Sequence, residues 1–493
     1  MAKPSIIKNS FYSFILLITN LFISLITAPY ISSVLGAAQL GRYNFINAFA
    51  SWFSIFSVFG ISLYGVRIVA KVRDDKDALS KAFSELIYIR IIFTAISLIL
   101  FGITIISITR VRQDSTLALI QCGVLLLNVL SIDWLYQGLE DYRYIAIRSL
   151  IFRAISVGAI FLFVKTQNHI IIYASIAALS LTASNIVNIF YLKKRIKFYF
   201  RGLNIKQHMK PLTFFFITAF FLNIYMMIDQ TLLGFLKTDA EVALLARARM
   251  FLTIALSVTA SINSALMPNL MARYEKDKNE GKRLMEFYSN VMLFFSIPIS
   301  IGTFFIAKYV LVLIGSEEFL QAKNAMMIFS LSIVTVSLGS FNYAQRIMVY
   351  KKESLGIIIS AITAGISLLL NILLIGKYGI IGCAVSYVVA EHIGNLVWYI
   401  IAKKIDGFNI FLRYDNLKYY IAGLIMIIVM YLSGRYFFGD IRWMNFILQT
   451  ILGASTYLIV LAILKEPVLY SGIRKCINVL PRRKKNANDE NKT

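Results

Sequence analysis

The chain has 493 residues, of which 58% are hydrophobic and only 15% are charged, and its mean hydropathy is +0.72. Soluble domains carry about 25% charged residues, so this composition excludes a soluble enzyme or a soluble binding module. The formal net charge of +25 would suit a nucleic-acid-binding protein, but the basic residues are distributed as in a membrane protein, and we expect no nucleic-acid partner.

Apolar runs long enough to cross a bilayer as helices recur from end to end of the chain. No connection between them much exceeds about 20 residues, which leaves no room for a soluble domain. The first run is too long for a cleaved signal sequence. We therefore predict an all-α polytopic membrane protein with about 14 transmembrane helices, at 11–35, 44–68, 84–109, 116–137, 146–165, 170–192, 211–236, 242–270, 287–312, 324–349, 355–375, 380–402, 417–436 and 444–465.

Lys and Arg residues gather in every second connection between these runs, most densely in 193–210 and in the tail PRRKK at 481–485. Cytoplasmic loops of membrane proteins carry such an excess of basic residues. The pattern predicts that both termini lie in the cytoplasm. It also explains the basic loops by topology and by contact with anionic lipid, without a specific partner.

The basic connection after the sixth run is the natural boundary between two halves of six runs each. The halves open alike, because ITAPYISSVLG ends a run at Gly36 and MMIDQTLLG ends a run at Gly234. Halves with an even number of spans share one orientation and are related by an axis along the membrane normal. We predict an N-terminal lobe at 1–200, a pseudo-symmetric C-terminal lobe at 201–405, two further spans within 406–470 and a basic cytoplasmic tail at 471–493.

Polar side chains recur at helical spacing within three of the later runs, and such stripes line cavities between helices. Small polar residues also join helices in lipid, so packing is the alternative for each stripe. The stripes are Arg249, Thr253, Ser257, Ser261 and Ser264; Ser360, Thr363, Ser367 and Asn371; and Tyr387, Glu391, Asn395 and Tyr399. Asn223 is a further candidate for the polar lining.

Asp229 stands in the middle of the apolar sequence YMMIDQTLLG, where an aspartate costs roughly 2.5–3.5 kcal/mol. Ionisable groups at such depth nearly always face the protein interior and form pairs there. We expect Asp229 to pair with Arg247 or Arg249 on the following helix. The pair is either a latch that substrate displaces or a permanent structural ion pair.

Glu391, near the centre of the twelfth run, is the candidate for an ion-coupling site. Burial raises the pKa of a carboxyl group, so Glu391 would exchange protons near neutral pH or bind sodium together with Asn395 and Asn371. His392 follows directly and titrates in the physiological range. Hydrogen bonds that pack helices together are the alternative role. Transport coupled to H⁺, Na⁺ or the membrane potential is therefore expected.

Five stretches of the chain resemble the polysaccharide transporter family, the Wzx-type flippases of the multidrug/oligosaccharidyl-lipid/polysaccharide exporter superfamily. Each stretch is short and apolar, but the five occur in order over essentially the whole chain. They are TAPYISSVLGAAQLGRYNF (27–45), NIYMMIDQTLLG (223–234), SALMPNLMARY (264–274), SIPISIG (296–302) and LLLNILLIGKYGIIGCAVSYVVA (368–390).

The resemblance implies a flippase that moves an undecaprenyl-(pyro)phosphate-linked oligosaccharide, of the teichoic acid, capsule or O-antigen type, across a bacterial cytoplasmic membrane by alternating access. It implies a V-shaped, MATE-like pair of lobes around a cationic cavity, with 417–436 and 444–465 forming a groove for the lipid tail. The polymerase and glycosyltransferases of the same pathway are the implied partners.

An arginine fork binds phosphate oxygens bidentately and stays charged, so buried arginines are the candidates for the headgroup contact. We rank Arg249 first, Arg247 second and Arg90 third. The lipid II flippase, which the family resembles, has a cavity arginine nineteen residues before the proline that ends its eighth span, and counting back from Pro268 gives Arg249. For Arg90 the alternative is a pair with Glu85 or snorkelling to the interface; Arg153 lies nearer a helix end, which favours snorkelling.

A MATE-like exporter of another small amphiphilic substrate is the alternative function. A cationic substrate would require unpaired acidic residues in the cavity, whereas the arginines outnumber Asp133, Asp229 and Glu391. The first span lacks the arginine that the lipid II flippase presents to its substrate, which argues against lipid II itself as cargo. Three scattered cysteines, three scattered histidines and the lack of a phosphate loop predict neither an enzyme nor a metal or other cofactor.

Overall fold

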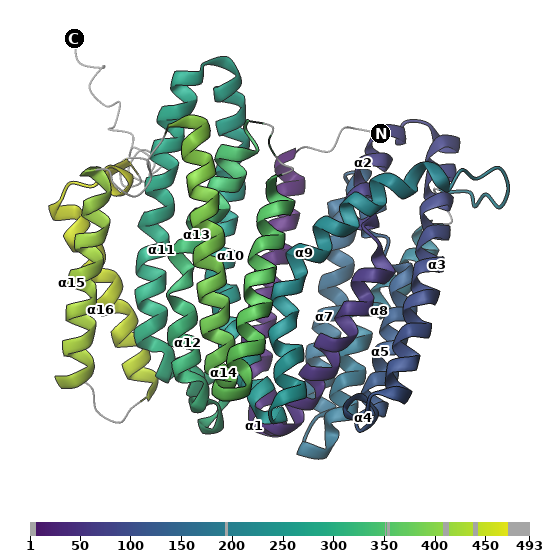
Figure 1. Ribbon diagram of the computed structural model, residues 1–493, viewed down its shortest axis with the longest axis horizontal. Helices are drawn as coiled ribbons and strands as arrows, with labels where there is room; N and C mark the ends of the chain where they lie inside the picture. The colour runs from purple at the N-terminus through teal and green to yellow at the C-terminus, as the bar shows by residue number, and fades with distance from the viewer. Residues whose placement is uncertain are drawn as a thin grey trace, which may run out of the picture. The chain divides into compact units, whose positions relative to one another are not determined.

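The computed structural model describes residues 6–192, 196–350, 352, 355–407, 414–436 and 442–471, and every regular element within these ranges is a helix (Figure 1). The long helices are α1 (Ile6–Val58), α2 (Ile61–Val72), α3 (Lys76–Ser107), α5 (Ser115–Leu127), α7 (Tyr142–Phe163), α8 (Ile170–Leu192), α9 (Lys206–Leu236), α10 (Asp239–Lys276), α11 (Lys278–Gly315), α13 (Ser332–Phe341), α14 (Leu355–Asp406), α15 (Tyr414–Tyr436) and α16 (Arg442–Ile463). The short elements are α4 (Thr109–Arg112), η1 (Asn128–Leu130), α6 (Asp133–Gly138), η2 (Gln167–His169), η3 (Glu317–Ala322), α12 (Lys323–Ser330) and the π-helix η4 (Asn342–Ile347).

The predicted all-α, multi-pass membrane class is confirmed. Within the described residues, ten helices are long and apolar enough to cross a membrane, or eleven if the pair Glu317–Ser330 and Ser332–Ile347, bent by 41°, forms one span. The predicted number of about 14 spans stays a prediction. Two of these ten are 51 and 52 residues long: Phe22–Val72, which runs from α1 into α2, and Leu355–Asp406, which is α14. Each of them overlaps two of the predicted apolar runs.

Glycine joins the two arms of each of these long helices. Gly36 in α1 has φ 71° and ψ 170°, and Gly379 in α14 has φ 53° and ψ −129°. An L-residue with a side chain adopts such a backbone only under strain, so glycine is required where the chain must turn between arms. A hydropathy pattern marks the two apolar runs but not the tight junction between them.

Three of the predicted spans are interrupted. The run 44–68 breaks at Phe59 and Gly60, both with positive φ, where a Cβ on Gly60 would come within 2.7 Å of the α9 backbone. The run 116–137 divides into α5, η1 and α6. The run 324–349 divides into α12, α13 and η4, whose π-helical turn places Arg346, which is fully buried, against Asp406 of α14.

Residues group by contact into two compact units. The first consists of Met1–Ile254, Val310–Phe329 and Ser354–Gly394, and the second of Ala255–Tyr309, Ser330–Glu353 and Asn395–Thr493. The lobes predicted at 1–200 and 201–405 and the pair of spans at 406–470 remain predictions. The predicted basic tail 471–493 lies outside the described residues except for Ser471.

The first unit has a core of stacked aromatic rings between α1, α2, α3 and α6. The rings of Phe59 and Phe93 stack with centroids 3.7 Å apart, and Phe83 stacks on Trp134 at 5.6 Å. Gly65 lets α2 approach Trp134 closely, because a Cβ there would lie 2.5 Å from the indole ring. This tight packing holds the ends of these four helices in place, and the same helices carry polar groups of the unit.

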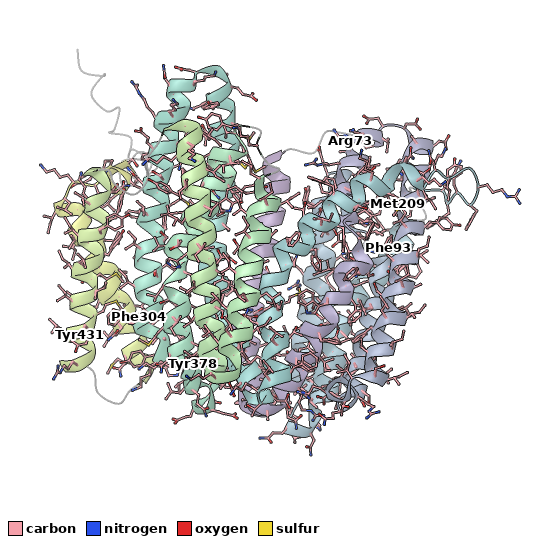
Figure 2. All side chains as sticks on the ribbon, in the orientation of Figure 1. Arg73, Phe93, Met209, Phe304, Tyr378 and Tyr431 are labelled. Atoms are coloured by element: carbon pink, nitrogen blue, oxygen red, sulfur yellow. The ribbon has the colours of Figure 1, made fainter. Side chains whose placement is uncertain are left out.

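The second unit has a core rich in methionine and tyrosine, in which α15 and α16 pack together and against α11. Met426, Met430 and Tyr457 are almost fully buried. Large apolar side chains also project outward in both units, as Figure 2 shows for Tyr378 and Tyr431, which are 52% and 58% exposed. Water-exposed surfaces rarely carry so much apolar area, so these faces are suited to lipid.

Candidate functional site

The hairpin of α9 and α10 carries a buried ion pair. Asp229 is 1% exposed and Arg249 is 8% exposed. Arg249 donates from Nη1 to Asp229 Oδ1 over 2.8 Å and from Nη2 to Oδ2, so the pair is bidentate. Bidentate pairs between arginine and carboxylate are the strongest and most directional ion pairs in proteins. Of the two partners expected for Asp229, the structure therefore pairs it with Arg249.

Aromatic rings enclose the guanidinium of Arg249. Its Cζ lies 5.6 Å from the ring centroids of both Phe329, in α12, and Tyr387, in α14. Cation–π contacts of this kind stabilise a charge that has left water. Arg249 lies ten residues after the start of α10, about 15 Å along the helix, which is about half the thickness of a bilayer's hydrocarbon. The fork of Arg249, predicted as the first headgroup contact, is thus occupied by Asp229.

Arg247, two residues earlier, contacts neutral groups among the residues that the structure describes. Its Nη2 donates to Ser32 Oγ in α1 over 2.5 Å, its Nη1 lies 3.5 Å from Met250 Sδ, and its Cζ lies 5.4 Å from the Phe319 ring centroid. Within the described part of the chain, no carboxylate lies within 4 Å of its guanidinium. Arg247 therefore carries a positive charge that no described acidic group offsets.

Arg90, the third predicted headgroup contact, is 2% exposed, so its guanidinium does not reach the surface. It donates from Nη1 to the Ser131 carbonyl over 2.8 Å, and its Nε has no hydrogen-bond partner among the described residues. Glu85, its alternative partner, instead contacts His208 over 2.8 Å and accepts from the Asn204 amide over 2.7 Å.

The predicted polar lining bonds mostly to its own helices. Thr253 Oγ1 donates to the Arg249 carbonyl over 3.0 Å, and Ser261 Oγ donates to the Ser257 carbonyl over 2.7 Å. Asn223 donates in the same way to the carbonyl four residues earlier, over 2.7 Å. Such back-bonding satisfies a polar group in lipid and often bends a helix. It agrees with the packing alternative, and the role of these residues as a cavity lining stays a prediction.

The residues predicted to couple transport to an ion all lie in α14. Glu391 and Asn371 are 8% and 1% exposed. Asn371 donates to Ser367 Oγ over 3.3 Å on its own helix, whereas His392 is exposed and contacts the Val388 carbonyl over 2.7 Å. Asn395 is buried, with its Oδ1 at the position that a Cβ on Gly339 would need. Among the described residues, no three His, Cys, Asp or Glu side chains are grouped to hold a metal ion.

The sequence reasoning missed an ionic network that ties α1, α4, α5 and α10 together. Arg42 Nε donates to Asp114 Oδ1 over 2.6 Å, and Asp114 is 3% exposed. Arg110 contacts Asp114 Oδ2 at 3.2 Å and also pairs with Asp239, the first residue of α10. The chain approaches closely here, since a Cβ on Gly41 would lie 1.6 Å from the Asp239 carbonyl oxygen. These residues lie in the short connections between the predicted apolar runs. Charged residues are common in such connections, so their presence there does not indicate an ionic network.

Two glutamates cap the helix arms that follow the glycine junctions. Glu318 Oε2 accepts a hydrogen bond from the amide of Ala37, directly after Gly36, over 2.9 Å. Glu241 Oε2 accepts one from the amide of Ile380, directly after Gly379, over 3.3 Å. A carboxylate at the start of a helix satisfies free amides and interacts favourably with the helix dipole. Both glutamates come from elsewhere in the chain, and neither was predicted.

Two solved structures of membrane transporters share the fold of this chain. The lipid II flippase MurJ, in an inward closed conformation, aligns with a TM-score of 0.75 and 20% sequence identity, covering 94% of this chain and 100% of that chain. An inward-facing multidrug resistance MATE family transporter of the MOP superfamily aligns with a TM-score of 0.62 and 13% identity, covering 78% of this chain and 94% of the other. The chain therefore shares its fold with these two transporters.

The family follows from the sequence itself. Residues 6–274 match the family described as polysaccharide biosynthesis protein, and the chain belongs to this family. A putative O-antigen transporter of Escherichia coli (strain K12) is 23% identical over 403 residues, which cover 79% of this chain and 94% of that protein. The membership that the five sequence stretches predicted is confirmed.

Proposed function

We propose that the protein is a flippase that moves an undecaprenyl-(pyro)phosphate-linked oligosaccharide from the inner to the outer leaflet of a bacterial cytoplasmic membrane. The transporter and flippase names of the relatives support this function. The observation that carries it is Arg247, a charge within a membrane-spanning helix with no described acidic partner. In this proposal the protein acts as a transporter and not as an enzyme.

The physical task is to carry a phosphorylated headgroup and a hydrophilic glycan across about 30 Å of hydrocarbon. A charged group in that layer is stabilised only if an opposite charge and hydrogen-bond donors replace its water. Arg247 supplies an unoffset guanidinium, held in place by Ser32. In this proposal Arg247 is the first headgroup contact and Arg249 the second.

Asp229 gives the site a way to respond to substrate. In the structure its two carboxylate oxygens accept hydrogen bonds from Nη1 and Nη2 of Arg249. A pyrophosphate that reaches Arg249 competes for the same donors and would displace the carboxylate. Substrate entry would then break a contact between α9 and α10, whereas a permanent pair would leave the hairpin unchanged.

Transport proceeds by alternating access in this proposal, with both termini in the cytoplasm.

Flipping of a fluorescent polyprenyl-pyrophosphate sugar, measured in vesicles by quenching from outside, tests this proposal. We expect R247Q to lower the flipping rate by at least about tenfold, the equivalent of 1.4 kcal/mol, because the headgroup loses a charge-assisted partner. R153Q, which removes an equal charge from α7, is the matched control and should transport normally. Normal flipping by R247Q at normal expression would contradict the proposal.

A MATE-like exporter of another small amphiphile is the second candidate, which the fold similarity to a MATE transporter favours. A cationic amphiphile would need an acidic group that is not already neutralised. Asp229 and Asp133 are both paired with arginine, through Arg249 and Arg148. Resistance to cationic drugs on expression, without any change in lipid-linked glycan on the inner leaflet, would favour this second function.

The energy source in this proposal is an ion gradient or the membrane potential, acting at Glu391. E391Q removes the titratable group and keeps the shape of the side chain. If protons drive transport through Glu391, E391Q vesicles should flip at one rate with and without a pH gradient. A gradient-dependent rate in E391Q would mean that the coupling site lies elsewhere.

The glycosyltransferases and polymerase of the same pathway would supply and consume the cargo.

A further inference from the structure

A buried chain of three side chains joins the start of α9 to α2 and α3. The ring of His208 contacts the Tyr64 hydroxyl through Nδ1 and Glu85 Oε2 through Nε2, each over 2.8 Å. His208, Glu85 and Tyr64 are 4%, 2% and 8% exposed, so two titratable groups meet away from solvent. The site assigned to translocation uses none of the three residues. Their role therefore has to be argued from their own chemistry.

The carboxylate of Glu85 has a single candidate for a counter-charge. Its Oε1 accepts from the Asn204 amide over 2.7 Å, and its Oε2 accepts from Gln207 Nε2 over 3.1 Å and contacts His208. Hydrogen bonds from several donors favour the ionised form of a carboxyl group. Within the described ranges, no Lys or Arg nitrogen lies within 4 Å of its oxygens. The buried charge is therefore offset only when His208 is protonated.

The other charged groups of the elements packed on His208 have their own contacts or are exposed to solvent. In α2, Arg67 lies over an aromatic ring with its Cζ 5.0 Å from the centroid, and in α3, Arg90 donates to the Ser131 carbonyl over 2.8 Å. The basic residues near this point in α3, in the connection to α9 and in α9 itself are exposed; they are Lys81, Lys197, Arg201, Lys206 and Lys210. Among the described residues, Glu85 is thus the charged group that contacts His208.

The chain keeps its hydrogen bonds whether or not His208 carries a second proton. In the neutral ring, Nε2–H donates to the carboxylate and Nδ1 accepts from the Tyr64 hydroxyl. In the imidazolium, Nδ1–H donates, and the hydroxyl, which is both a donor and an acceptor, accepts. The proton changes the pair of His208 and Glu85 from negative to neutral without the loss of a contact to the ring. Because an unoffset buried charge is costly, the protonated chain is the more tightly held.

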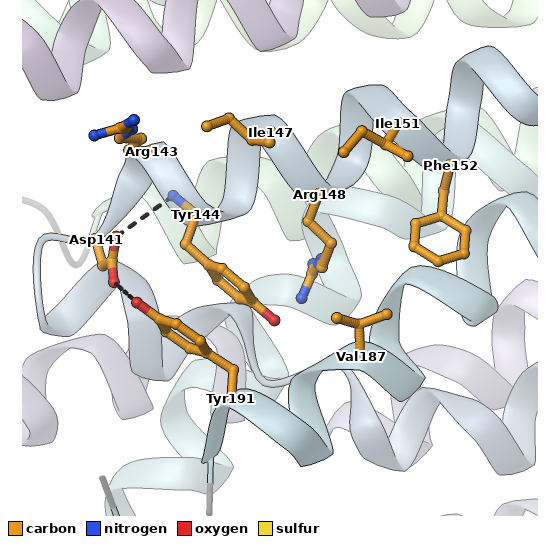
Figure 3. A pocket seen from close by; sticks show the side chains of 9 residues that line it. All are labelled: Asp141, Arg143, Tyr144, Ile147, Arg148, Ile151, Phe152, Val187 and Tyr191. Atoms are coloured by element: carbon orange, nitrogen blue, oxygen red, sulfur yellow. Dashed lines mark hydrogen bonds between the residues drawn. The ribbon is translucent and has the colours of Figure 1, made fainter. Parts of the chain in front are cut away.

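The residues between α8 and α9 are fastened to the same stretch of α3. Their starting point is fixed, because Tyr191, near the end of α8, stacks on Tyr144 of α7 with ring centroids 4.0 Å apart (Figure 3). Residues 196–205, which we call the strap, then contact α3 through backbone amides. The last of these amides is that of Asn204, which donates to Glu85. The firmness of the strap therefore depends on the charge state of Glu85 and its partner.

We propose that Glu85, His208 and Tyr64 form a proton-binding site that controls how firmly the strap is held on α3. With the proton bound, His208 offsets Glu85 and the strap is fastened. Loss of the proton leaves the carboxylate unoffset, and hydration of that charge requires the Asn204 amide to separate from it. The proton is exchanged with water on the cytoplasmic side in the proposed orientation, where Asn204 and Gln207 are exposed. Histidine changes its charge between about pH 5 and 8, so the strap loosens as the pH rises through this range.

Hydrogen–deuterium exchange of the purified full-length protein tests this proposal, with mass spectrometry of peptides that cover the strap and the start of α9. After correction for the pH dependence of intrinsic exchange, we expect the protection of the strap to fall at least about threefold from about pH 6 to about pH 8. The bonds from the Lys197 and Tyr199 amides to Ser80 and Ser84 involve no titratable group and predict no such change. Equal protection at the two pH values would overturn the proposal.

Variants separate proton binding from a purely structural role. H208Q removes the titratable ring and E85Q removes the charge that the proton offsets, so in both the protection of the strap should be independent of pH, whatever its level. H169Q is the matched control, because His169 lies in the connection between α7 and α8, where it accepts from the Lys165 amide, and the pH dependence should persist. A pH dependence that survives in H208Q or E85Q would contradict the assignment.

Thermal melting at both pH values shows whether each variant folds. Either H208Q or E85Q alone decides the question, so the test stands if one of them does not fold. Exchange is measured without transport, and its outcome is therefore independent of the proposed function.

Discussion

Asp229 and Arg249 depend on each other, because changing one side chain alone leaves the other as an unpaired charge in an apolar interior. Removing one partner of a buried ion pair typically costs about 3–5 kcal/mol, whereas replacing both with apolar residues is often neutral. We expect D229N to melt well below the unmodified protein, and D229L/R249M to regain most of the lost stability. Thermal unfolding of the purified proteins measures both.

The double variant also separates the two roles of the pair. If the pair is a latch for substrate, D229L/R249M should be stable and yet flip slowly in vesicles. If the pair is only structural, stability and transport should return together. A double variant that melts as low as D229N would show that the contact is not the source of the instability.

At the scale of single residues, the sequence could predict the buried pair but not most of the other contacts. Asp229 and Arg249 are conspicuous because each interrupts an apolar run, and only a short turn separates their helices. Glu85, His208 and Tyr64 form a buried chain of hydrogen bonds of 2.8 Å each, yet they come from three distant stretches. Nothing in the local pattern of any one of them points to the other two.

The glycine junctions act at the scale of helical elements. We expect G379A to destabilise the protein by about 1–3 kcal/mol, because a side chain strains the positive φ and a Cβ would lie 2.1 Å from Glu241 Oε2. G376A, three residues earlier in the same helix, has open space and an ordinary backbone, so it is the matched control. Melting temperatures that fall equally in the two variants would argue against a special role for Gly379.

Element boundaries show where hydropathy stops being informative. The sequence correctly separates 146–165 from 170–192, where α7 and α8 are distinct helices. It places a basic loop after α8 but gives no sign that this loop is fastened to α3. Ser80 and Ser84 accept hydrogen bonds from the Lys197 and Tyr199 amides over 3.1 and 3.0 Å. A serine at the end of a span is too common to predict such a contact.

The same loop carries a side-chain bond to α3. The Tyr199 hydroxyl donates to Asp77 over 3.0 Å, and this hydrogen bond raises the pKa of Tyr199 above its ordinary value. The neutral phenol is thus the form that the contact favours. Together with the Glu85 contact to the Asn204 amide, these bonds hold the connection between the two predicted lobes against one helix.

At the scale of the whole molecule, alternating access requires some contacts between helices to break in each cycle. The network of Arg42, Asp114, Arg110 and Asp239 is the strongest candidate, because it joins the start of α10 to α1 and α4. We expect R110C/D239C, cross-linked by a bifunctional thiol reagent in a cysteine-free background, to stop flipping. Reduction of a cleavable linker should restore it.

A matched cross-link within one segment controls for chemical damage. R110C/D114C joins residues four apart that move together, so its cross-linked form should keep the activity of its uncross-linked form. Transport at the normal rate in cross-linked R110C/D239C would mean that this network stays closed throughout the cycle. The general class follows from the length and number of the apolar runs, while the orientation and the repeated halves stay predictions. The contacts of this ionic network depend on close approach between helices and leave no trace in composition.

The pairing of Asp229 with Arg249 has a consequence for how the protein enters the membrane during synthesis. Only Lys237 and Thr238 separate α9 from α10, so the two helices can leave the translocon as one hairpin. An isolated helix with a central aspartate pays roughly 2.5–3.5 kcal/mol on insertion, and a central arginine costs about the same. Joined in the hairpin, the two charges neutralise each other before any other helix arrives. The insertion of α9 therefore depends on the presence of α10, and that of α10 on the presence of α9.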